Sequence, residues 1–364
     1  MNPFSVVYNS EYFCDREKET ELLKNNAENG LNTLIHSPRR LGKTALIQNL
    51  FHHLENEKKW DTIYVDLFST QNMNGLITLL AEKVLKKYHK KNFIHGVTNI
   101  LKGISPTITI APDGSPSLSL NLVESQQKQT LEDLTDFLEK QKKPVIIAFD
   151  EFQEVAVYPE KAEALLRSYI QHLKNVKFIY SGSSNHLLQD MFYSAKRPFY
   201  QSSEVLILEK IDRKIYSSFI ENTFKKNKKE IEQEALNFIL NFSETYTYYT
   251  QICCNQCFSK TENNLTEPEC RSILYEYLES RKADYIQVMN LLPENQKKVA
   301  IGVAKEGTVS QPTSFDFILK YNLPSSSSTL QAVKSLTEKE ILYHHQGNYV
   351  IYDVFFKEFL KTYF

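Results

Sequence analysis

The chain contains 364 residues with a formal net charge of −1 at pH 7, and five of the residues are cysteines. The length allows two or three domains with sizeable cores, and the balanced charge gives no electrostatic bias toward nucleic acid, acidic substrates or anionic lipid. No apolar run has the length of a membrane span, and the first residues lack the basic and apolar regions of a signal peptide. Because an odd number of cysteines also argues against a disulfide framework, we expect a cytoplasmic protein that does not contact a membrane.

The first informative segment lies between residues 33 and 54, where a short apolar strand, a tight loop and an apolar helix follow one another. Gly42-Lys43-Thr44 stands at the start of the helix, as in a P-loop, whose backbone N–H groups and helix dipole face a phosphate. We expect Lys43 to reach the β- and γ-phosphates of ATP and the Thr44 hydroxyl to hold Mg²⁺. Ser37 stands where the first glycine of the pattern belongs, and the alternative is an ordinary loop and helix start. The predicted nucleotide contacts are Ser37, Pro38, Arg39, Arg40, Leu41, Gly42, Lys43, Thr44 and Ala45.

Two further segments precede the next motif. Residues 62–67 are apolar enough for an additional strand. Residues 102–121 break the α/β rhythm with two alternating segments on either side of Asp113-Gly114, which is a β-hairpin pattern. This insertion either contacts a partner or is a decorative edge of the core without such a role.

The second motif is an apolar run, residues 145–149, that ends in Asp150 and Glu151. Such a run is typical of a central parallel strand, and open α/β sheets place their chemistry at the carboxyl ends of these strands. We expect Asp150 to hold Mg²⁺ opposite Thr44, usually through water, and Glu151 to act as general base or to orient the attacking water. The acidic pair alone would also suit a polar helix start, but its position after a P-loop strand favours the nucleotide site.

The strand at residues 176–180 ends in a serine- and glycine-rich segment, residues 181–184. A hydroxyl at this strand end, for which we choose Ser183, would sense the γ-phosphate or position water. The alternative is a simple turn, which serine and glycine form readily.

The remainder of the chain is predicted to be mostly helical. Residues 210–283 have the pattern of a small helical lid, in which Cys253 and Cys257 fall on one helix face and behave as small hydrophobic residues rather than as zinc ligands. In residues 284–364, helices precede a candidate recognition helix at 327–336 and two short strands around Gly347-Asn348, the order of a winged helix-turn-helix.

Together these segments resemble the prokaryotic (archaeal-type) ATPase family of P-loop proteins, related to AAA+ and STAND ATPases. The resemblance implies an α/β P-loop NTPase of the ASCE, AAA+-like type, with a parallel-sheet core in residues 1–209, a lid and a C-terminal winged helix. It also places Arg16 beside the nucleotide base. The family often has an arginine in PLYGR, whereas PFYQS at 198–202 has none and Arg197 lies just upstream. The matching motifs are FCDRE at 13–17, SPRRLGKT at 37–44, FDEFQ at 149–153, SGSS at 181–184, TYTYYTQ at 245–251 and YVIYDVFFK at 349–357.

The leading functional hypothesis is an Mg²⁺-dependent ATPase switch that couples nucleotide state to movement of the lid and winged helix, and so to binding of an unidentified protein partner. Arg39 and Arg40 either contact the nucleotide, the lid or a neighbouring subunit of an oligomer, or are a solvated pair. The first alternative is a DNA-binding ATPase, which is not favoured because the candidate recognition helix offers Gln331 and Lys334 but no arginine. The second is a nucleotide-binding scaffold with little turnover, suggested by Ser37 and the missing arginine.

Overall fold

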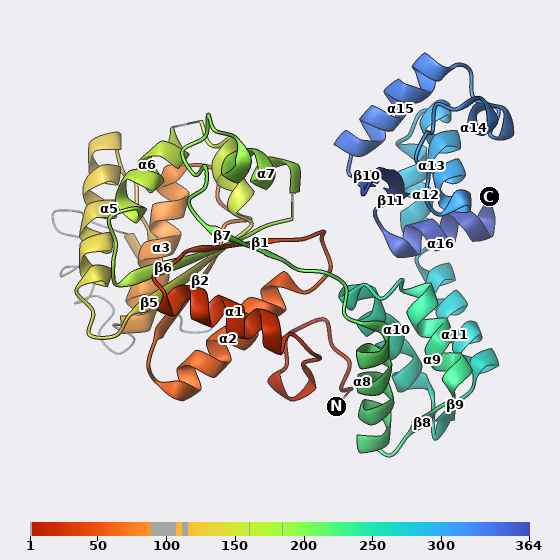
Figure 1. Ribbon diagram of the computed structural model, residues 1–364, viewed down its shortest axis with the longest axis horizontal. Helices are drawn as coiled ribbons and strands as arrows, with labels where there is room; N and C mark the ends of the chain where they lie inside the picture. The colour runs from red at the N-terminus through yellow and green to blue at the C-terminus, as the bar shows by residue number, and fades with distance from the viewer. Residues whose placement is uncertain (1, 89–106, 111–115, 160, 184) are drawn as a thin grey trace. The chain divides into compact units, whose positions relative to one another are not determined.

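The computed structural model describes residues 2–88, 107–110, 116–159, 161–183 and 185–364. The chain divides into two compact units (Figure 1). The first unit is formed by Val7–Glu209, and the second by Lys210–Phe364 together with residues 2–6. Among the described residues, no helix combines the length and the apolar character needed to cross a bilayer.

The first unit is built on a five-stranded, entirely parallel sheet with the strand order β2-β5-β6-β1-β7. The strand after which the P-loop begins, β1, is therefore separated by β6 from β5, which ends in Asp150. In a parallel sheet all carboxyl ends lie at one edge, so this edge collects the ends of β1, β5 and β6. The strands are β1 (Thr33–His36), β2 (Asp61–Asp66), β5 (Val145–Asp150), β6 (Val176–Ser181) and β7 (Glu204–Ile207).

Helices cover both faces of this sheet (Figure 1). Every residue of β5 is buried, as the apolar run predicted. One face packs on a large apolar core that includes an aromatic cluster, in which the rings of Phe149 and Phe178 are stacked 5.8 Å apart. The helices in the described residues of this unit are α1 (Glu17–Glu28), α2 (Lys43–Glu57), α3 (Met73–Tyr88), α5 (Glu124–Glu139), α6 (Ala162–Ile170) and α7 (Asn185–Tyr193), with the 3-10 helices η1 (Ser10–Tyr12) and η2 (Phe152–Val157).

A two-stranded antiparallel sheet lies within the segment predicted as a hairpin insertion. It pairs β3 (Thr107–Ile110) with β4 (Pro116–Ser119), whereas residues 102–106 and the predicted turn at Asp113 and Gly114 lie outside the described residues. The segment after β4 is fixed to α3, because Asn74 Nδ2 donates to the Leu120 carbonyl (2.7 Å) and Asn74 Oδ1 accepts from the Leu122 amide (3.2 Å). Leu120 and Leu122 are buried in the core of the unit. This part of the insertion thus has a packing role, and a role in partner contact stays a prediction.

The second unit is mainly helical and ends in a compact helix and hairpin arrangement. Helix α13 packs on both α15 and α16, beside the antiparallel pair β10–β11. The buried Cys253 and Cys257 of α10 are free thiols. The predicted division of this unit at residues 283/284 stays a prediction. Its elements are α8 (Arg213–Lys226), β8 (Glu230–Ile231), α9 (Gln233–Phe242), α10 (Thr247–Lys260), β9 (Asn264–Leu265), α11 (Glu267–Ser280), α12 (Lys282–Asn290), α13 (Glu294–Glu306), α14 (Phe315–Lys320), α15 (Ser326–Glu338), β10 (Leu342–His345), β11 (Asn348–Ile351) and α16 (Val354–Tyr363).

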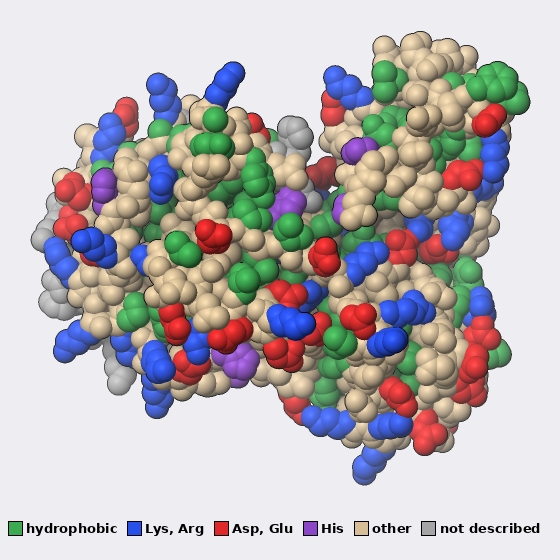
Figure 2. Space-filling model, viewed as in Figure 1, with side chains coloured by type: hydrophobic (Ala, Val, Ile, Leu, Met, Phe, Trp, Pro, Cys, Tyr) green, Lys and Arg blue, Asp and Glu red, His purple; other side chains and the backbone are tan. Residues whose placement is uncertain are grey.

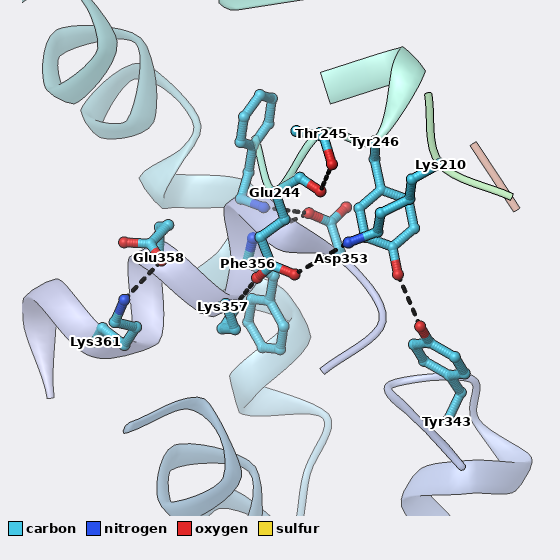
Figure 3. Close-up of polar contacts among 11 residues, drawn as sticks. Lys210, Glu244, Thr245, Tyr246, Tyr343, Asp353, Phe356, Lys357, Glu358 and Lys361 are labelled. Atoms are coloured by element: carbon cyan, nitrogen blue, oxygen red, sulfur yellow. Dashed lines mark hydrogen bonds and ion pairs between the residues drawn. The ribbon is translucent and has the colours of Figure 1, made fainter. Parts of the chain in front are cut away.

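A polar cluster links the predicted lid segment to the predicted winged-helix segment inside this unit (Figure 3). Glu244 forms ion pairs with Lys357 and, at 3.9 Å, with Lys210, while the Tyr246 and Tyr343 hydroxyls are 2.7 Å apart. Burial lowers the pKa of both Lys210 and Lys357 to about 8. Glu244 and Tyr246 precede α10, Tyr343 lies on β10, and Lys357 lies on α16, so the cluster connects segments far apart in the sequence.

Residues 2–6 pack on the second unit, although the predicted core boundary placed them with the first. The Phe4 ring, which is 1 % exposed, lies 5.5 Å from the Phe224 ring and 5.8 Å from the Phe258 ring. Asn2 Nδ2 donates to the Asn255 carbonyl at 2.9 Å. These contacts join the start of the chain to α8 and α10.

We therefore expect Phe4→Ala to lower the free energy of unfolding of the second unit by about 3 to 5 kcal/mol, because it leaves a cavity among aromatic rings. Urea unfolding combined with hydrogen exchange of the α8 and α10 amides measures this unit separately from the first. Val6→Ala is the matched control: Val6 is 59 % exposed, and its truncation should change stability by less than about 0.5 kcal/mol. Equal effects of the two substitutions would contradict the packing role of Phe4.

Candidate active site

The loop between β1 and α2 has the backbone geometry of an anion-binding turn. Arg40 (φ 69°) and Gly42 (φ 91°) both adopt the left-handed conformation, which glycine accepts without steric cost. Helix α2 begins at Lys43 directly after this turn, so the unbonded N–H groups of its first turn border the loop. Of the other predicted contacts, Ser37, Pro38, Arg39 and Leu41 lie in the loop and Ala45 lies in the first turn of α2.

Lys43 is a buried cation that the loop itself coordinates. Its side chain is 8 % exposed, and Nζ donates to the Ser37 carbonyl (3.1 Å), the Ser37 hydroxyl (3.3 Å) and the Pro38 carbonyl (3.0 Å). Burial lowers the Lys43 pKa to about 8, while the nearby charges of Asp150 and Glu151 act in the opposite direction. The serine that replaces the first P-loop glycine thus serves as an acceptor for the P-loop lysine.

Asp150, at the end of β5, is a buried carboxylate with four hydrogen-bond donors. The Thr44 and Tyr64 hydroxyls each donate to Oδ2 at 2.7 Å. The Ser181 hydroxyl (2.5 Å) and the Glu151 amide (3.1 Å) donate to Oδ1. Burial and the Asp150 charge raise the pKa of Tyr64 well above its usual range, so the phenol remains a donor. The structure therefore brings together Thr44 and Asp150, the two predicted metal ligands.

Glu151 is held by residues of η2 and of the segment after β6. Its backbone is left-handed (φ 54°), and Oε2 accepts from Gln153 Nε2 (2.6 Å), the Ser183 amide (3.0 Å) and the Ser183 hydroxyl (2.7 Å). A Cβ atom at Gly182 would lie 1.9 Å from Gln153 Oε1, so a side chain at this position would displace the Gln153 amide that donates to Glu151. The predicted base and the predicted sensor are thus in contact, while Ser184 lies outside the described residues.

Two predicted arginines have different surroundings. The Arg16 guanidinium donates hydrogen bonds to Glu19 Oε1 (2.6 Å) and to the Glu209 carbonyl (2.5 Å). Neither acceptor belongs to the group of residues around Asp150. The positive charge of Arg39, by contrast, acts on the Lys43 pKa and lowers it. Arg39, itself a loop residue, therefore acts electrostatically on the Lys43 ammonium, whereas a contact of Arg16 with the nucleotide base stays a prediction.

Arg197, the arginine upstream of the family motif position, is engaged within the first unit. Its guanidinium forms ion pairs with Glu163 and Asp190, each at 3.1 Å. Glu163 is buried, and burial raises its pKa. Arg197 thus has two carboxylate partners in its own unit.

The donor set around Thr44 fits magnesium. Mg²⁺ prefers oxygen ligands, and usually keeps several waters while taking one or two protein groups and substrate phosphates. The Thr44 hydroxyl and the Asp150 carboxylate are such ligands, 2.7 Å apart. Within the described part of the chain, no group of three or more His, Cys, Asp and Glu residues could hold a metal ion by itself. A magnesium ion here would thus be shared with the nucleotide.

Sequence analysis gave no individual role to three residues of this group: Tyr64, Ser181 and Gln153, of which Ser181 and Gln153 lie within the motifs at 181–184 and 149–153. A signal existed for Ser181, since it stands at a strand end immediately before Gly182 and Ser183. Tyr64 gave no such signal, because it lies inside β2, opposite Ala148 of β5. Only the register of the two strands and the length of the phenol side chain bring its hydroxyl to Asp150.

Two family models match the chain. A model of an ATPase domain predominantly from Archaea matches residues 13–247, and a model of a probable winged helix domain matches residues 283–362. A search of curated proteins found no match.

Solved structures share the fold across nearly the whole chain. A Walker-type ATPase of Pyrococcus abyssi is similar over 99 % of each chain, with a TM-score of 0.67 and 17 % identity. The ORC2 protein of Aeropyrum pernix, in ADPNP-ADP complexes, is 14 % identical with a TM-score of 0.64, covering 99 % of this chain and 95 % of that one. The ORC1 protein of the same organism, in complex with DNA, is 15 % identical with a TM-score of 0.53, covering 96 % and 92 %. These likenesses and the winged-helix match confirm the predicted P-loop core and C-terminal winged helix.

The lowered Lys43 pKa predicts a pH dependence of ATP binding. Below about pH 8 the ammonium is charged and attracts the phosphates, whereas above about pH 8 it is increasingly neutral. We expect the affinity for a non-hydrolysable ATP analogue to fall about tenfold per pH unit above that value, measured by calorimetry from pH 7 to 9.

Lys43→Arg is the matched control, because an arginine stays charged throughout this range. The affinity of this variant, whatever its absolute value, should be flat from pH 7 to 9. An equally steep loss in both proteins would show that another group causes the pH dependence.

Proposed function

Because this chain belongs to the family of ATPase domains found predominantly in Archaea, we propose that it is an Mg²⁺-dependent ATPase that works as a molecular switch. In this proposal the nucleotide state changes the arrangement of the helical lid (residues 210–283) and the winged helix (residues 284–364), and so controls binding of another protein. The observation that carries the proposal is the convergence of Lys43, Thr44, Asp150 and Glu151 at one edge of the sheet.

The roles proposed for these residues follow from their positions. Lys43 would exchange its loop carbonyls for the β- and γ-phosphate oxygens of ATP, while the first-turn amides of α2 bind the same phosphates. Thr44 and Asp150 would hold Mg²⁺. When bound, this ion would neutralise the negative charge that develops on the phosphate oxygens during transfer. Together these groups stabilise a transition state whose charge is spread over the γ-phosphoryl oxygens.

Glu151 would orient the attacking water and accept its proton. One of its oxygens, Oε2, already accepts three hydrogen bonds from Gln153 and Ser183, so these donors compete with the attacking water for this oxygen. Ser183 would therefore act as the γ-phosphate sensor. Its hydroxyl, which now donates a hydrogen bond to Glu151, would donate to the phosphate instead when ATP is bound. This exchange would link arrival of ATP to release of the base.

A protein partner is proposed because the winged helix exposes large apolar side chains. On α14, Phe315 is 76 % exposed and Leu319 is 69 % exposed, and on α15 Leu330 is 57 % exposed. Phe315 and Leu319 are four residues apart and so share one face of α14, and contiguous exposed apolar surface marks protein interaction sites. Gln331 and Lys334 are also exposed on α15. Of these two, only Lys334 carries a positive charge that could bind a DNA phosphate.

Glu151→Gln tests the proposed reaction. The glutamine keeps the shape of the side chain but cannot accept a proton, so we expect ATP turnover to fall about 10²- to 10⁴-fold while the affinity for ATP is retained. Phosphate release and nucleotide binding measure the two quantities, and Glu132→Gln, on the exposed side of α5, is the matched control. Wild-type turnover in Glu151→Gln would show that Glu151 is not the base. Binding without turnover in the wild type would favour the scaffold alternative.

DNA binding is tested by titration with duplex DNA at increasing salt. Over the face drawn in Figure 2, basic and acidic side chains are interspersed, and phosphate binding normally needs clustered positive charge. We expect no dissociation constant below about 10⁻⁶ M at physiological salt, whether ATP is present or not. Tight, salt-dependent binding that Lys334→Ala weakens would overturn this expectation and favour the DNA-binding alternative.

A further inference from the structure

The Tyr64 hydroxyl has an unusual position for a side chain in the middle of a strand. It donates to Asp150 Oδ2 at 2.7 Å, and the same oxygen accepts from Thr44 at 2.7 Å. Tyr64 reaches this oxygen from β2, which is the edge strand of the sheet next to β5. The proposed function gives Thr44 and Asp150 a role, but it leaves Tyr64 without one.

Counting acceptor positions shows why this contact matters. A carboxylate offers about four lone-pair positions, two on each oxygen. On Oδ1 of Asp150 these are used by the Ser181 hydroxyl and the Glu151 amide, and on Oδ2 by Thr44 and Tyr64. With these four donors in place, the usual positions of Asp150 are all taken, so a metal ion or a water bound to one must compete with a donor for this carboxylate.

The four donors differ in how easily they can leave. The Glu151 amide belongs to the backbone, and Ser181 is completely buried at the end of β6. Thr44 can keep its bond, because a hydroxyl that donates its hydrogen still has lone pairs for a metal. Tyr64 is only partly buried, and rotation of its side chain moves the hydroxyl without moving the backbone. Tyr64 is therefore the donor whose withdrawal frees Asp150 at the least structural cost.

We propose that Tyr64 is a positioning residue of the ATPase site, whose hydroxyl occupies Asp150 Oδ2 and must withdraw before Asp150 holds Mg²⁺. This inference rests on the proposed Mg²⁺-dependent function. Its consequence is that the protein needs more Mg²⁺ than Thr44 and Asp150 alone would require, because the ion competes with the phenol for one carboxylate oxygen.

The test is the Mg²⁺ dependence of nucleotide binding, which does not depend on turnover. Binding of a fluorescent, non-hydrolysable ATP analogue is titrated with Mg²⁺ in the wild type and in Tyr64→Phe, which loses only the hydroxyl. We expect the half-saturating Mg²⁺ concentration to fall about 5- to 10-fold in the variant, since a charge-assisted hydrogen bond no longer competes. Tyr64→Met, which also lacks the donor, should shift it in the same direction.

Tyr180→Phe is the matched control. Tyr180 lies on the neighbouring strand β6, is fully buried, and its hydroxyl has no hydrogen-bond partner among the described residues. Removing that hydroxyl should leave the Mg²⁺ dependence within about twofold of the wild type, because the Tyr180 hydroxyl donates no hydrogen bond to Thr44 or Asp150.

The outcomes separate the inference from the function on which it rests. If the wild type binds the analogue with Mg²⁺ and the half-saturating concentration is unchanged or higher in Tyr64→Phe and Tyr64→Met, the role of Tyr64 is wrong and the proposed function stands. An equal shift in Tyr180→Phe would likewise overturn it. If the wild type shows no Mg²⁺-dependent binding at all, the proposed function itself fails.

Discussion

The Asp150 carboxylate is the constraint around which the first unit is organised. A buried carboxylate costs much free energy unless hydrogen bonds replace the water that it has lost. The protein supplies these bonds from three strands or their ends and from the first turn of α2, through Tyr64, Ser181, the Glu151 amide and Thr44. The strand order meets the same need, because β6 between β1 and β5 brings Ser181 beside Asp150.

The phosphate-binding loop solves the same physical problem for the opposite charge. Lys43 is buried, as Asp150 is, and the loop compensates with the carbonyls of Ser37 and Pro38 and with the Ser37 hydroxyl. A glycine at position 37 would lack the last of these acceptors. The departure from the P-loop pattern therefore changes what Lys43 contacts, while the left-handed turn at Gly42 keeps the loop's path into α2.

Sequence analysis predicted the parts of this arrangement that depend on local pattern. Apolar runs located the central strands, and the rule that chemistry gathers at strand ends placed Thr44 next to Asp150. Contacts that depend on strand register were not predictable, since nothing within β2 distinguishes Tyr64 from a packing residue. The position of Phe4 was equally hidden, because a single aromatic residue has no periodicity and its ring partners lie more than two hundred residues away. The predicted site roles themselves await the binding and turnover measurements.

The packing of residues 2–6 on α8 and α10 has a consequence for dissecting the protein. The polypeptide passes between the two units twice, once at Val7 and once at Lys210, so the ATPase unit is inserted within the sequence of the other. A proteolytic cut at either passage leaves the units covalently joined through the remaining one. A fragment that starts at residue 210 would lack Phe4 and so expose the Phe224 and Phe258 rings on which it packs. For such a fragment to fold by itself, residues 2–6 would have to be rejoined to it by a short linker.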